Sequence, residues 1–364
     1  MAGPFLLSGR RSIMPLLTRR GFAVSTAALA ASAALPGTLP GSRAGAQTTP
    51  AGWSEAPGLP LRVQEIYPGL LDGRIYVLGG LTPDLGPDAI NISDRFLSWA
   101  PGDTEWREHA SFPVPVHHPQ LIGFNGRLMA IGGFTSDGGD LWSMRREILA
   151  YDPAGDRWQE EEPMAQPLAE TVSAVSGDSI HLVTGRRPQS GANQRWTDHA
   201  DVNAHIVLRA GHEDWVPAPP APTARNSAAS VLVNGMLHVI GGRTVSGGNT
   251  PVHEAFDLEA GRWSTLAPLP VPAAGPRGAG GLAAAQVYGT IFTFGGEWFD
   301  DGGGVYDQVW AYDTREDRWR EATRMPTPRH GLGAVALDGA IYTIGGAAQA
   351  GGVNTSASVE VFRP

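Results

Sequence analysis

The chain has 364 residues, and its 48 glycines and 30 prolines predict many turns rather than long helices. Residues 1–46 hold five of the 27 arginines and no acidic residue, so the remainder carries 22 arginines against 36 acidic residues, a net charge of −14 that disfavours nucleic acid or an anionic membrane as partner. Lysine and cysteine are absent, which excludes Schiff-base chemistry, disulfides, thiolate catalysis and cysteine-ligated metals.

The leading segment has the composition of an export signal. An arginine pair in residues 18–22, TRRGF, precedes an apolar, alanine-rich stretch over 23–35 and a small-residue site, AGA, at 44–46. The arginine pair resembles the twin-arginine signal of bacteria, with a Sec signal as the alternative, and the apolar stretch is too short to span a membrane. We therefore predict a signal over 1–46, a mature domain over 47–364, and a periplasmic or secreted location.

One ten-residue pattern recurs six times from residue 71 onward. The first copy is LDGRIYVLGG at 71–80 and the last is LDGAIYTIGG at 337–346. The second glycines of the six copies stand at 80, 133, 185, 242, 296 and 346, a period of 50 to 57 residues. Internal repeats of this length are typical of propeller blades.

A second landmark follows each of the first five copies: an aromatic residue or its replacement, a turn, and a tryptophan at the seventh position after it. Clear copies are YDPAGDRW at 151–158, FDLEAGRW at 256–263 and YDTREDRW at 312–319, and looser copies cover 99–106 and 208–215. Because the spacing is constant, we expect these tryptophans to pack between blades.

Each period predicts four strands, a to d. Strand a ends at an Asn-Gly or Asp-Gly pair, which favours a tight hairpin to strand b, and strand b is rich in β-branched and aromatic residues. The glycine pair then marks a point where neighbouring backbones crowd. Strand c ends at the aromatic residue and strand d carries the tryptophan. One such sheet cannot bury both faces, whereas six arranged radially can.

The two ends of the repeat region are complementary. Residues 358–364 form a strand c without a following d, and Trp53 marks a strand d without a preceding c. The N-terminal strand is therefore expected to complete the last blade and to close the ring.

These motifs resemble the kelch β-propeller family over roughly residues 51–364. The third copy departs from the pattern, with Thr184-Gly185 for the glycine pair and Leu208-Arg209 for Tyr-Asp. The resemblance implies an all-β, six-bladed kelch β-propeller with four antiparallel strands per blade. Exported bacterial members of the family include a sialic-acid mutarotase. The related copper galactose oxidases need a cysteine cross-linked to tyrosine, so that activity is excluded here.

The b–c and d–a connections are long and lie at one end of each blade, which makes this end the expected working face. Polar residues recur in the d–a connections at shared distances from the following turn. They would surround the channel mouth and bind an anionic or hydroxyl-rich ligand, or their arginines would clamp carbonyls of neighbouring blades, and both interpretations stay open. The candidate ligand-binding residues are Gln64, His117, His118, Glu170, Arg225, Asn226, Arg277, Arg329 and His330.

Three loop tryptophans, Trp142, Trp196 and Trp298, lie outside the repeat pattern. Exposed loop aromatics beside charged residues are typical of sugar or protein recognition, and packing between loops is the alternative. We therefore expect a binding module for a carbohydrate or a protein, monomeric and without a membrane span.

An enzyme of sugar anomer or epimer chemistry, similar to the mutarotase, is the alternative function. Such chemistry needs an acid/base pair at the channel mouth, and Glu297 with Arg243 or Arg329 is the candidate. The histidines come from different blades and form no short-spaced ligand motif, so neither a metal nor another cofactor is expected.

Overall fold

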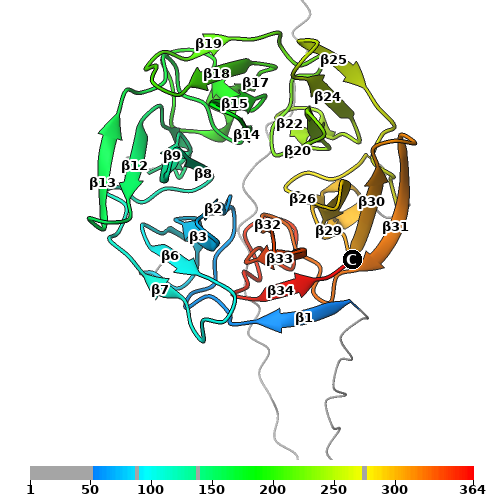
Figure 1. The fold of residues 1–364 in the computed structure, drawn as a ribbon, viewed down its shortest axis with the longest axis horizontal. Helices are drawn as coiled ribbons and strands as arrows, with labels where there is room; N and C mark the ends of the chain where they lie inside the picture. Colours follow the sequence, from blue (N-terminus) through cyan, green and yellow to red (C-terminus); the bar gives the residue numbers. More distant parts are fainter. Residues whose placement is uncertain (1–51, 87–89, 137–139, 273–276) are drawn as a thin grey trace, which may run out of the picture. The chain divides into compact units, whose positions relative to one another are not determined.

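The computed structural model describes residues 52–86, 90–136, 140–272 and 277–364. The predicted signal at 1–46 lies outside these ranges. The described residues form a six-bladed β-propeller with four antiparallel strands per blade, which confirms the predicted fold class (Figure 1). Within these ranges, no helix has the length and apolar character needed to cross a membrane.

In every blade the first strand lies beside the central axis and the last lies at the rim (Figure 1). Blade 1 contains β2 (Gly69–Leu71), β3 (Arg74–Leu78), β6 (Phe96–Trp99) and β7 (Arg107–Glu108). Blade 2 contains β8 (Gln120–Phe124), β9 (Arg127–Ile131), β12 (Ile148–Asp152) and β13 (Arg157–Glu161). Blade 3 contains β14 (Val172–Ser176), β15 (Ser179–Val183), β18 (His205–Arg209) and β19 (Val216–Pro217).

The second half of the ring repeats the same order. Blade 4 contains β20 (Ala229–Val233), β21 (Met236–Ile240), β24 (His253–Asp257) and β25 (Arg262–Thr265). Blade 5 contains β26 (Ala283–Val287), β27 (Thr290–Phe294), β30 (Gln308–Asp313) and β31 (Arg318–Arg324). Blade 6 contains β32 (Gly333–Leu337), β33 (Ala340–Ile344), β34 (Val359–Phe362) and, from the start of the described chain, β1 (Trp53–Ala56).

The N-terminal strand closes the ring as predicted. β1 pairs antiparallel with β34, with Trp53 opposite Phe362 (Figure 1). The Trp53 ring lies 5.1 Å from that of Phe362 and 6.1 Å from that of Phe294 in blade 5. The closing strand therefore contributes apolar packing as well as backbone hydrogen bonds.

The strand a to b turns have the backbone that their sequence predicts. Asp72 and Gly73 have φ angles of 49° and 72°, the two left-handed residues of a type I′ hairpin. The same pair of left-handed residues occurs at the Asn-Gly and Asp-Gly positions of blades 2, 4 and 6.

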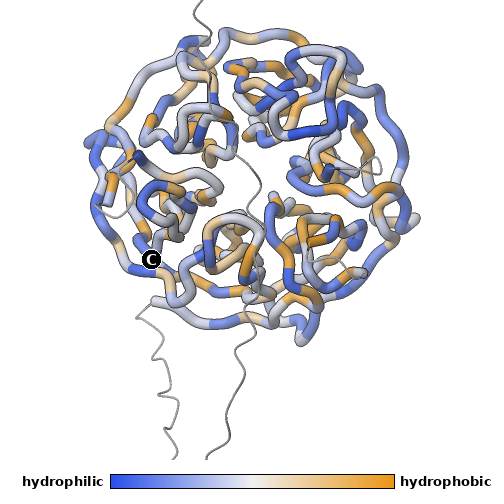
Figure 2. Tube along the Cα trace, turned by 180° about the vertical axis from the view of Figure 1, so that it is seen from behind, coloured by the Kyte–Doolittle hydropathy of each residue, from blue (hydrophilic) through white to orange (hydrophobic). Residues whose placement is uncertain are grey.

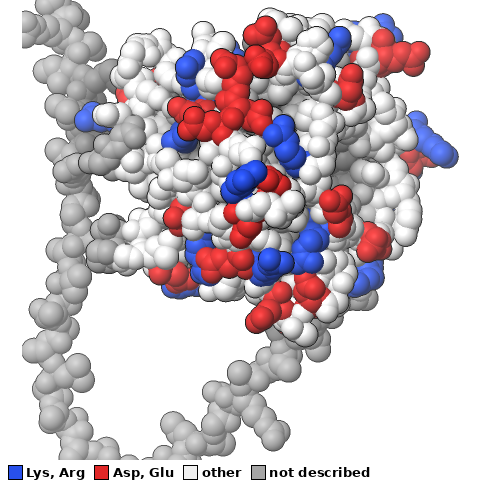
Figure 3. All heavy atoms as spheres, turned by 60° about the vertical axis from the view of Figure 1, so that its left-hand side comes forward, with Lys and Arg blue, Asp and Glu red and all other residues white. Residues whose placement is uncertain are grey.

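The core lies between the blades. Each of six buried apolar clusters combines side chains of two neighbouring blades, for example Leu78 and Phe96 of blade 1 with Leu121 and Tyr151 of blade 2. Hydrophobic segments accordingly recur in every blade (Figure 2). Figure 3 shows a face of the molecule on which arginine and acidic side chains both occur.

The glycine pairs lie where adjacent blades meet. A Cβ atom on Gly295 would overlap the carbonyl oxygen of Arg329 in the next connection, and the following residue, Gly296, donates its N–H to that carbonyl at 3.0 Å. Gly79, Gly80 and Val116 repeat this arrangement between blades 1 and 2. The predicted crowding of backbones is therefore present, and it links each blade to the next.

The long b–c connections fold into small hairpins of their own in blades 1 to 5. The paired strands are β4 (Leu81–Thr82) with β5 (Asn91–Ile92), β10 (Phe134–Thr135) with β11 (Ser143–Met144), β16 (Arg186–Pro188) with β17 (His199–Asp201), β22 (Arg243–Thr244) with β23 (Gly248–Asn249), and β28 (Glu297–Trp298) with β29 (Gly304–Val305). Two short 3-10 helices, η1 (Trp196–Asp198) and η2 (Asp300–Gly302), extend two of them. Each of the five first strands also pairs with the d–a connection of its own blade.

Candidate functional site

A ring of six residues, one just before each innermost strand, surrounds the axis. All six have left-handed backbone, with φ between 47° and 63°. Five backbone hydrogen bonds of 2.7–3.2 Å join neighbouring members, so the ring connects the blades directly. The ring residues are Glu65, His118, Glu170, Ser227, Gly281 and Gly331.

Four ring residues are not glycine, although left-handed backbone costs such residues about 1–2 kcal/mol each. Strained conformations of this kind persist where the surrounding structure holds them, and they cluster at functional sites. At Glu65, His118 and Glu170 the strain accompanies ionisable side chains that meet one another at the axis.

Above the ring lies a cavity of about 570 Å³, here called the axial cup. Its walls come from the b–c hairpins and its floor from the ring and the residues beside it. The apolar wall consists of Leu81, Ile90, Leu141, Trp142, Trp196, Val245 and Phe299. The polar lining includes Gln64, Glu65, Arg243, Asn249, Glu297 and His330.

Glu65 occupies the floor between two imidazoles. Its Oε2 lies 2.8 Å from Nε2 of His118. His118 contacts Nδ1 of His117 through its own Nδ1 at 2.7 Å, and Nε2 of His117 donates to the carbonyl of Leu141 at 2.6 Å. With Nε2 of His117 as the donor, Nδ1 of His117 accepts from His118, and the chain fixes the orientation of both rings.

The electrostatics of the floor keep Glu65 ionised. Burial alone would raise the pKa of Glu65, but His118, His330 and Arg243 outweigh burial and hold this pKa below its usual range. Burial and the neighbouring His118 lower the pKa of His117 to about 3, so His117 remains neutral at physiological pH. Glu65 therefore presents an ionised carboxylate that accepts hydrogen bonds.

Arg243 joins two carboxylates below the cup. Its Nη1 lies 2.5 Å from Oε1 of Glu297 and its Nη2 lies 3.3 Å from Oε1 of Glu170. Burial would lower the pKa of Arg243, but Glu170 and Glu297 outweigh it and raise this pKa. The other oxygen of Glu297 accepts the N–H of Gly351 at 2.8 Å.

His330 has one nitrogen without a hydrogen bond. Its Nε2 donates to the carbonyls of Gln349 and Gly351 at 3.0 and 2.8 Å. Its Nδ1 lies 3.4 Å from Oε2 of Glu297 and 3.6 Å from Oε1 of Glu65, and it has no hydrogen-bond partner among the described residues.

A buried arginine supports the aromatic wall from behind. The guanidinium carbon of Arg186 lies 3.5 Å from the ring centre of Trp196, and its Nε lies 2.5 Å from Oε2 of Glu170. The rings of Trp142 and Phe134 lie 5.5 and 5.1 Å from the same guanidinium. One face of Trp196 is therefore occupied by a cation of the protein itself.

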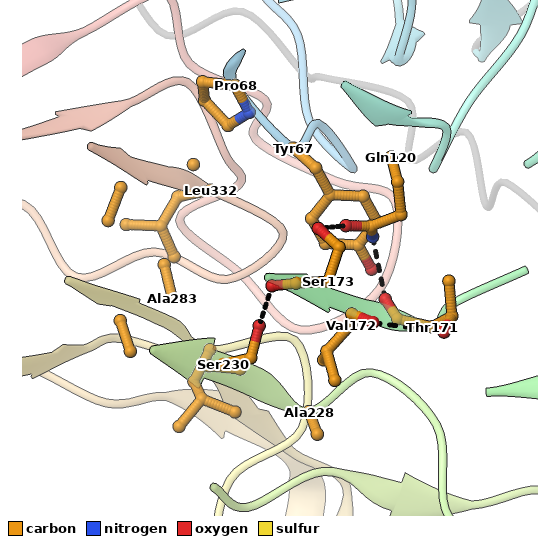
Figure 4. A pocket seen from close by; sticks show the side chains of 15 residues that line it. Tyr67, Pro68, Gln120, Thr171, Val172, Ser173, Ala228, Ser230, Ala283 and Leu332 are labelled. Carbon is orange, nitrogen blue, oxygen red and sulfur yellow. Dashed lines mark hydrogen bonds between the residues drawn. The ribbon is translucent and has the colours of Figure 1, made fainter. Parts of the chain in front are cut away.

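On the other side of the ring, the innermost strands enclose a channel cavity of about 170 Å³ (Figure 4). Tyr67 projects into it, opposite Leu332 and Pro68 (Figure 4). Burial and the carboxylates of Glu170 and Glu65 raise the pKa of Tyr67, so its hydroxyl keeps its proton. Ser173 and Gln120 hydrogen-bond each other along the wall at 2.7 Å.

The structure divides the sequence candidates into three groups. The first group lines the axial cup and consists of Gln64, Trp142, Trp196, Arg243, Glu297 and His330. The second group is buried at or behind the floor and consists of His117, His118, Glu170 and Asn226. The third group does not line the cup and consists of Arg225, Arg277, Trp298 and Arg329.

In the third group, the two recurring arginines lie inside the blades. Arg225 contacts Glu254 at 2.6 Å and donates to the carbonyls of Gly241 and Val239, so it clamps carbonyls of blade 4 itself and not, as predicted, those of a neighbouring blade. Arg329 contacts Glu360 at 2.6 Å in the same way, so the candidate pairing of Glu297 with Arg329 is not formed. The pairing of Glu297 with Arg243 is formed.

The other two members of the third group lie in the outer loops. Arg277 is exposed and lies 3.4 Å from Asp300. The Trp298 ring packs against the ring of Tyr306 at 4.6 Å, which is the loop-packing arrangement.

Three residues of the site were missed in the sequence: Glu65, Arg186 and Phe299. Glu65 follows Gln64 in the same register in which His118 follows His117, so a comparison of the d–a connections could have found it. Phe299 stands beside Trp298, and only the turn of the β28–β29 hairpin decides which of the two faces the axis.

A six-bladed propeller with a cup at its axis is an architecture typical of modules that bind proteins or other ligands. Residues 173–359 match the family model described as the KLHDC2/KLHL20/DRC7 Kelch-repeats domain. The chain belongs to the kelch-repeat family.

Relatives show how far this similarity extends. The Kelch-like protein terF of Aspergillus terreus is 27% identical over 328 residues, which cover 86% of this chain and 68% of that protein. Kelch-like protein 35 of Mus musculus is 31% identical over 150 residues, but these cover only 23% of the mouse protein and 41% of this chain. The solved structure titled "Structure of YjhT" covers 85% of this chain and 97% of its own, with a TM-score of 0.71 and 15% identity, a likeness of fold alone.

Proposed function

We propose that the protein binds a carbohydrate in the axial cup. The observation that carries this proposal is the cup itself, about 570 Å³ with aromatic walls above a charged floor. Its volume lies within the range of about 300–1,000 Å³ that small-molecule sites occupy. Protein partners, which kelch propellers in general bind, would contact the rim and leave much of this volume unused.

The two parts of the lining match the two parts of a sugar. A pyranose ring has an apolar face of C–H groups, which packs on aromatic rings, and an edge of hydroxyl groups, which bond to carboxylates and guanidinium groups. Phe299 is 59% exposed although it is large and apolar. A sugar stacked on Phe299 would cover this surface and bring its hydroxyls toward Glu65 and Arg243.

The test is saturation-transfer NMR and calorimetry with a panel of monosaccharides and short glycans. Phe299→Ala should weaken binding by at least about tenfold, because truncating a buried aromatic contact commonly costs more than 1 kcal/mol. Tyr288→Ala is the matched control, since Tyr288 is an aromatic of the same blade that is 87% exposed on the a–b turn at the opposite end. Failure of every sugar to bind, or equal loss in both variants, would disprove the proposal.

A sugar mutarotase or epimerase of the sialic-acid mutarotase type is the second candidate. It is favoured by the contact between Glu297 and Arg243 at 2.5 Å on the cup floor. Against it, both oxygens of Glu297 already accept hydrogen bonds, and the pKa of Glu65 is low, so Glu65 holds no proton to donate. Exchange NMR of sugar anomers distinguishes a binding protein from an enzyme. If the protein accelerates anomer exchange and Glu297→Gln removes that acceleration, the enzyme is favoured.

We also propose that the protein is exported to the periplasm or beyond by the twin-arginine route. The support is the TRRGF motif and the weakly apolar stretch after it. Replacement of Arg19 and Arg20 by lysine should retain the protein in the cytoplasm in a fractionation assay. Normal export of that variant would show that the segment is a Sec signal.

A further inference from the structure

We infer that the axial cup selects a ligand with a protonated amine, and that the ammonium group binds the carboxylate of Glu65. This inference rests on the proposed function and narrows it from sugars in general to amino sugars. Three independent features of the described residues carry it: the charge balance of the floor, an unused acceptor on Glu65, and an unpartnered nitrogen of His330.

The floor holds more carboxylates than fixed cations. Arg186 and Arg243 are its only guanidinium groups among the residues that the structure describes, and each contacts Glu170. One surplus negative charge remains, which favours a cationic ligand. The three carboxylates are Glu65, Glu170 and Glu297.

Glu65 is the carboxylate that a ligand can reach. Its side chain is 13% exposed, whereas those of Glu170 and Glu297 are 0% and 3% exposed. Glu297 uses both oxygens on Arg243 and Gly351. Glu65 uses Oε2 toward His118, but the nearest ionisable group to its Oε1 is Nδ1 of His330 at 3.6 Å, beyond hydrogen-bond length.

The unpartnered nitrogen of His330 marks the same place. The ring is 1% exposed, and its Nδ1 lies between Oε1 of Glu65 and Oε2 of Glu297. Nε2 carries the proton that bonds to the carbonyls of Gln349 and Gly351, whereas Nδ1 has no hydrogen-bond partner among the described residues. Oε1 of Glu65 and Nδ1 of His330 therefore lie 3.6 Å apart without a hydrogen bond between them. An ammonium group brings three N–H donors, which a neutral hydroxyl cannot match.

The walls above Glu65 also favour a cation. Phe299 and Trp142 line the cup with aromatic rings, whose faces attract ammonium groups. The protein already uses this attraction, since Arg186 lies 3.5 Å and Arg243 lies 5.4 Å from the ring centre of Trp196.

Two matched pairs of probes test the inference by calorimetry and NMR. Glucosamine and glucose differ only in the amine, and so do cyclohexylamine and cyclohexanol, which lack the sugar hydroxyls. The amine of each pair should bind about tenfold tighter or more. Glu65→Gln should remove that preference. The matched control is Glu316→Gln, an exposed carboxylate on the c–d turn of blade 5 that pairs with Arg318.

The outcomes separate the inference from the proposed function. Equal binding of glucosamine and glucose would overturn the inference and leave carbohydrate binding intact. A Glu65-dependent preference for cyclohexylamine without binding of either sugar would support the inference and disprove carbohydrate binding. If no amine is preferred in either pair, the inference fails. If Glu65→Gln does not fold, the two pairs of probes are compared on the unaltered protein, and NMR contacts to Phe299 and Trp142 locate the amine. Contacts of the amine elsewhere on the protein would overturn the inference.

Discussion

The indole N–H of Trp319 donates to the backbone carbonyl of Ala267 at 2.9 Å, and this bond joins the outer strand of blade 5 to the connection that leaves blade 4. Trp106, Trp158 and Trp263 bond in the same way to the preceding connection, at 2.8–3.1 Å. The repeated tryptophan thus connects one blade to the previous one, in addition to its packing. The Nε1 atoms of Trp53 and Trp215 are the exceptions, without a hydrogen-bond partner among the described residues.

This difference gives a matched pair of substitutions. Trp319→Phe should lower the free energy of unfolding by about 1–3 kcal/mol, because the carbonyl of Ala267 loses its donor and the core loses volume. Trp215→Phe should cost less, since it also removes a buried N–H that has no partner. Urea denaturation of both variants measures the difference, and an equal loss would show that packing alone sets the role of these residues.

Arg225 should matter for stability rather than for the ligand. Arg225→Ala leaves Glu254 buried without its partner, so we expect a loss of about 3–5 kcal/mol in thermal or chemical unfolding. Arg315→Ala, an exposed arginine on the turn of blade 5, should change stability by less than about 0.5 kcal/mol. If Arg225→Ala instead keeps its stability and loses ligand binding, the d–a arginines would be ligand-binding residues and not clamps.

Two buried histidines predict a loss of stability in acid. Nδ1 of His238 lies 2.9 Å from Nε2 of His253, and burial lowers their pKa values to about 4 and about 3. The unfolded chain, with a histidine pKa near 6.5, binds more protons than the folded chain below that pH. Stability from this pair is therefore complete above about pH 6.5 and declines as the pH falls toward 4.

The corresponding positions of blade 5 hold Phe292 and Val309, which supply a matched variant. Replacing His238 by Phe and His253 by Val should make the free energy of unfolding less dependent on pH between 6.5 and 4, whatever the change at neutral pH. Urea titrations at several pH values measure this slope. An unchanged slope would show that other groups cause the acid sensitivity.

Ring closure depends on the N-terminal strand. Deletion of residues 47–57 removes β1 and exposes the edge of β34, and an exposed edge strand pairs with other chains. We expect aggregation in light scattering and a broader unfolding transition. A synthetic peptide of residues 52–57 added in trans should restore part of the monomer. A truncated protein that remains monomeric and equally stable would show that the ring closes by other contacts.

The fold could be derived from the sequence because its signals are local and repeated. An Asn-Gly or Asp-Gly pair determines a tight hairpin by itself. The glycine pair marks a position at the junction of two blades where a side chain would overlap the backbone of the next connection. The tryptophan spacing fixes how outer strands pair. Six copies of these short-range rules leave few alternatives to a closed ring, and the unpaired strands at the two ends indicate how it closes.

The site could be derived only in part, because repeat position does not determine side-chain direction. Gln64 and His330 face the cup as their shared position suggested, whereas Arg225 and Arg329, one residue earlier in the repeat, point into their blades. Residues 64, 226 and 330 form β-bridges, and consecutive residues of such an extended segment project to opposite sides.

Closure of the ring then brings Glu65 beside His330, 265 residues later in the chain, with their ionisable atoms 3.6 Å apart. The sequence alone therefore determined the blades, their number and their closure. Which ionisable groups meet at the axis was decided by the tertiary structure, because that meeting depends on a strained backbone held by hydrogen bonds between blades.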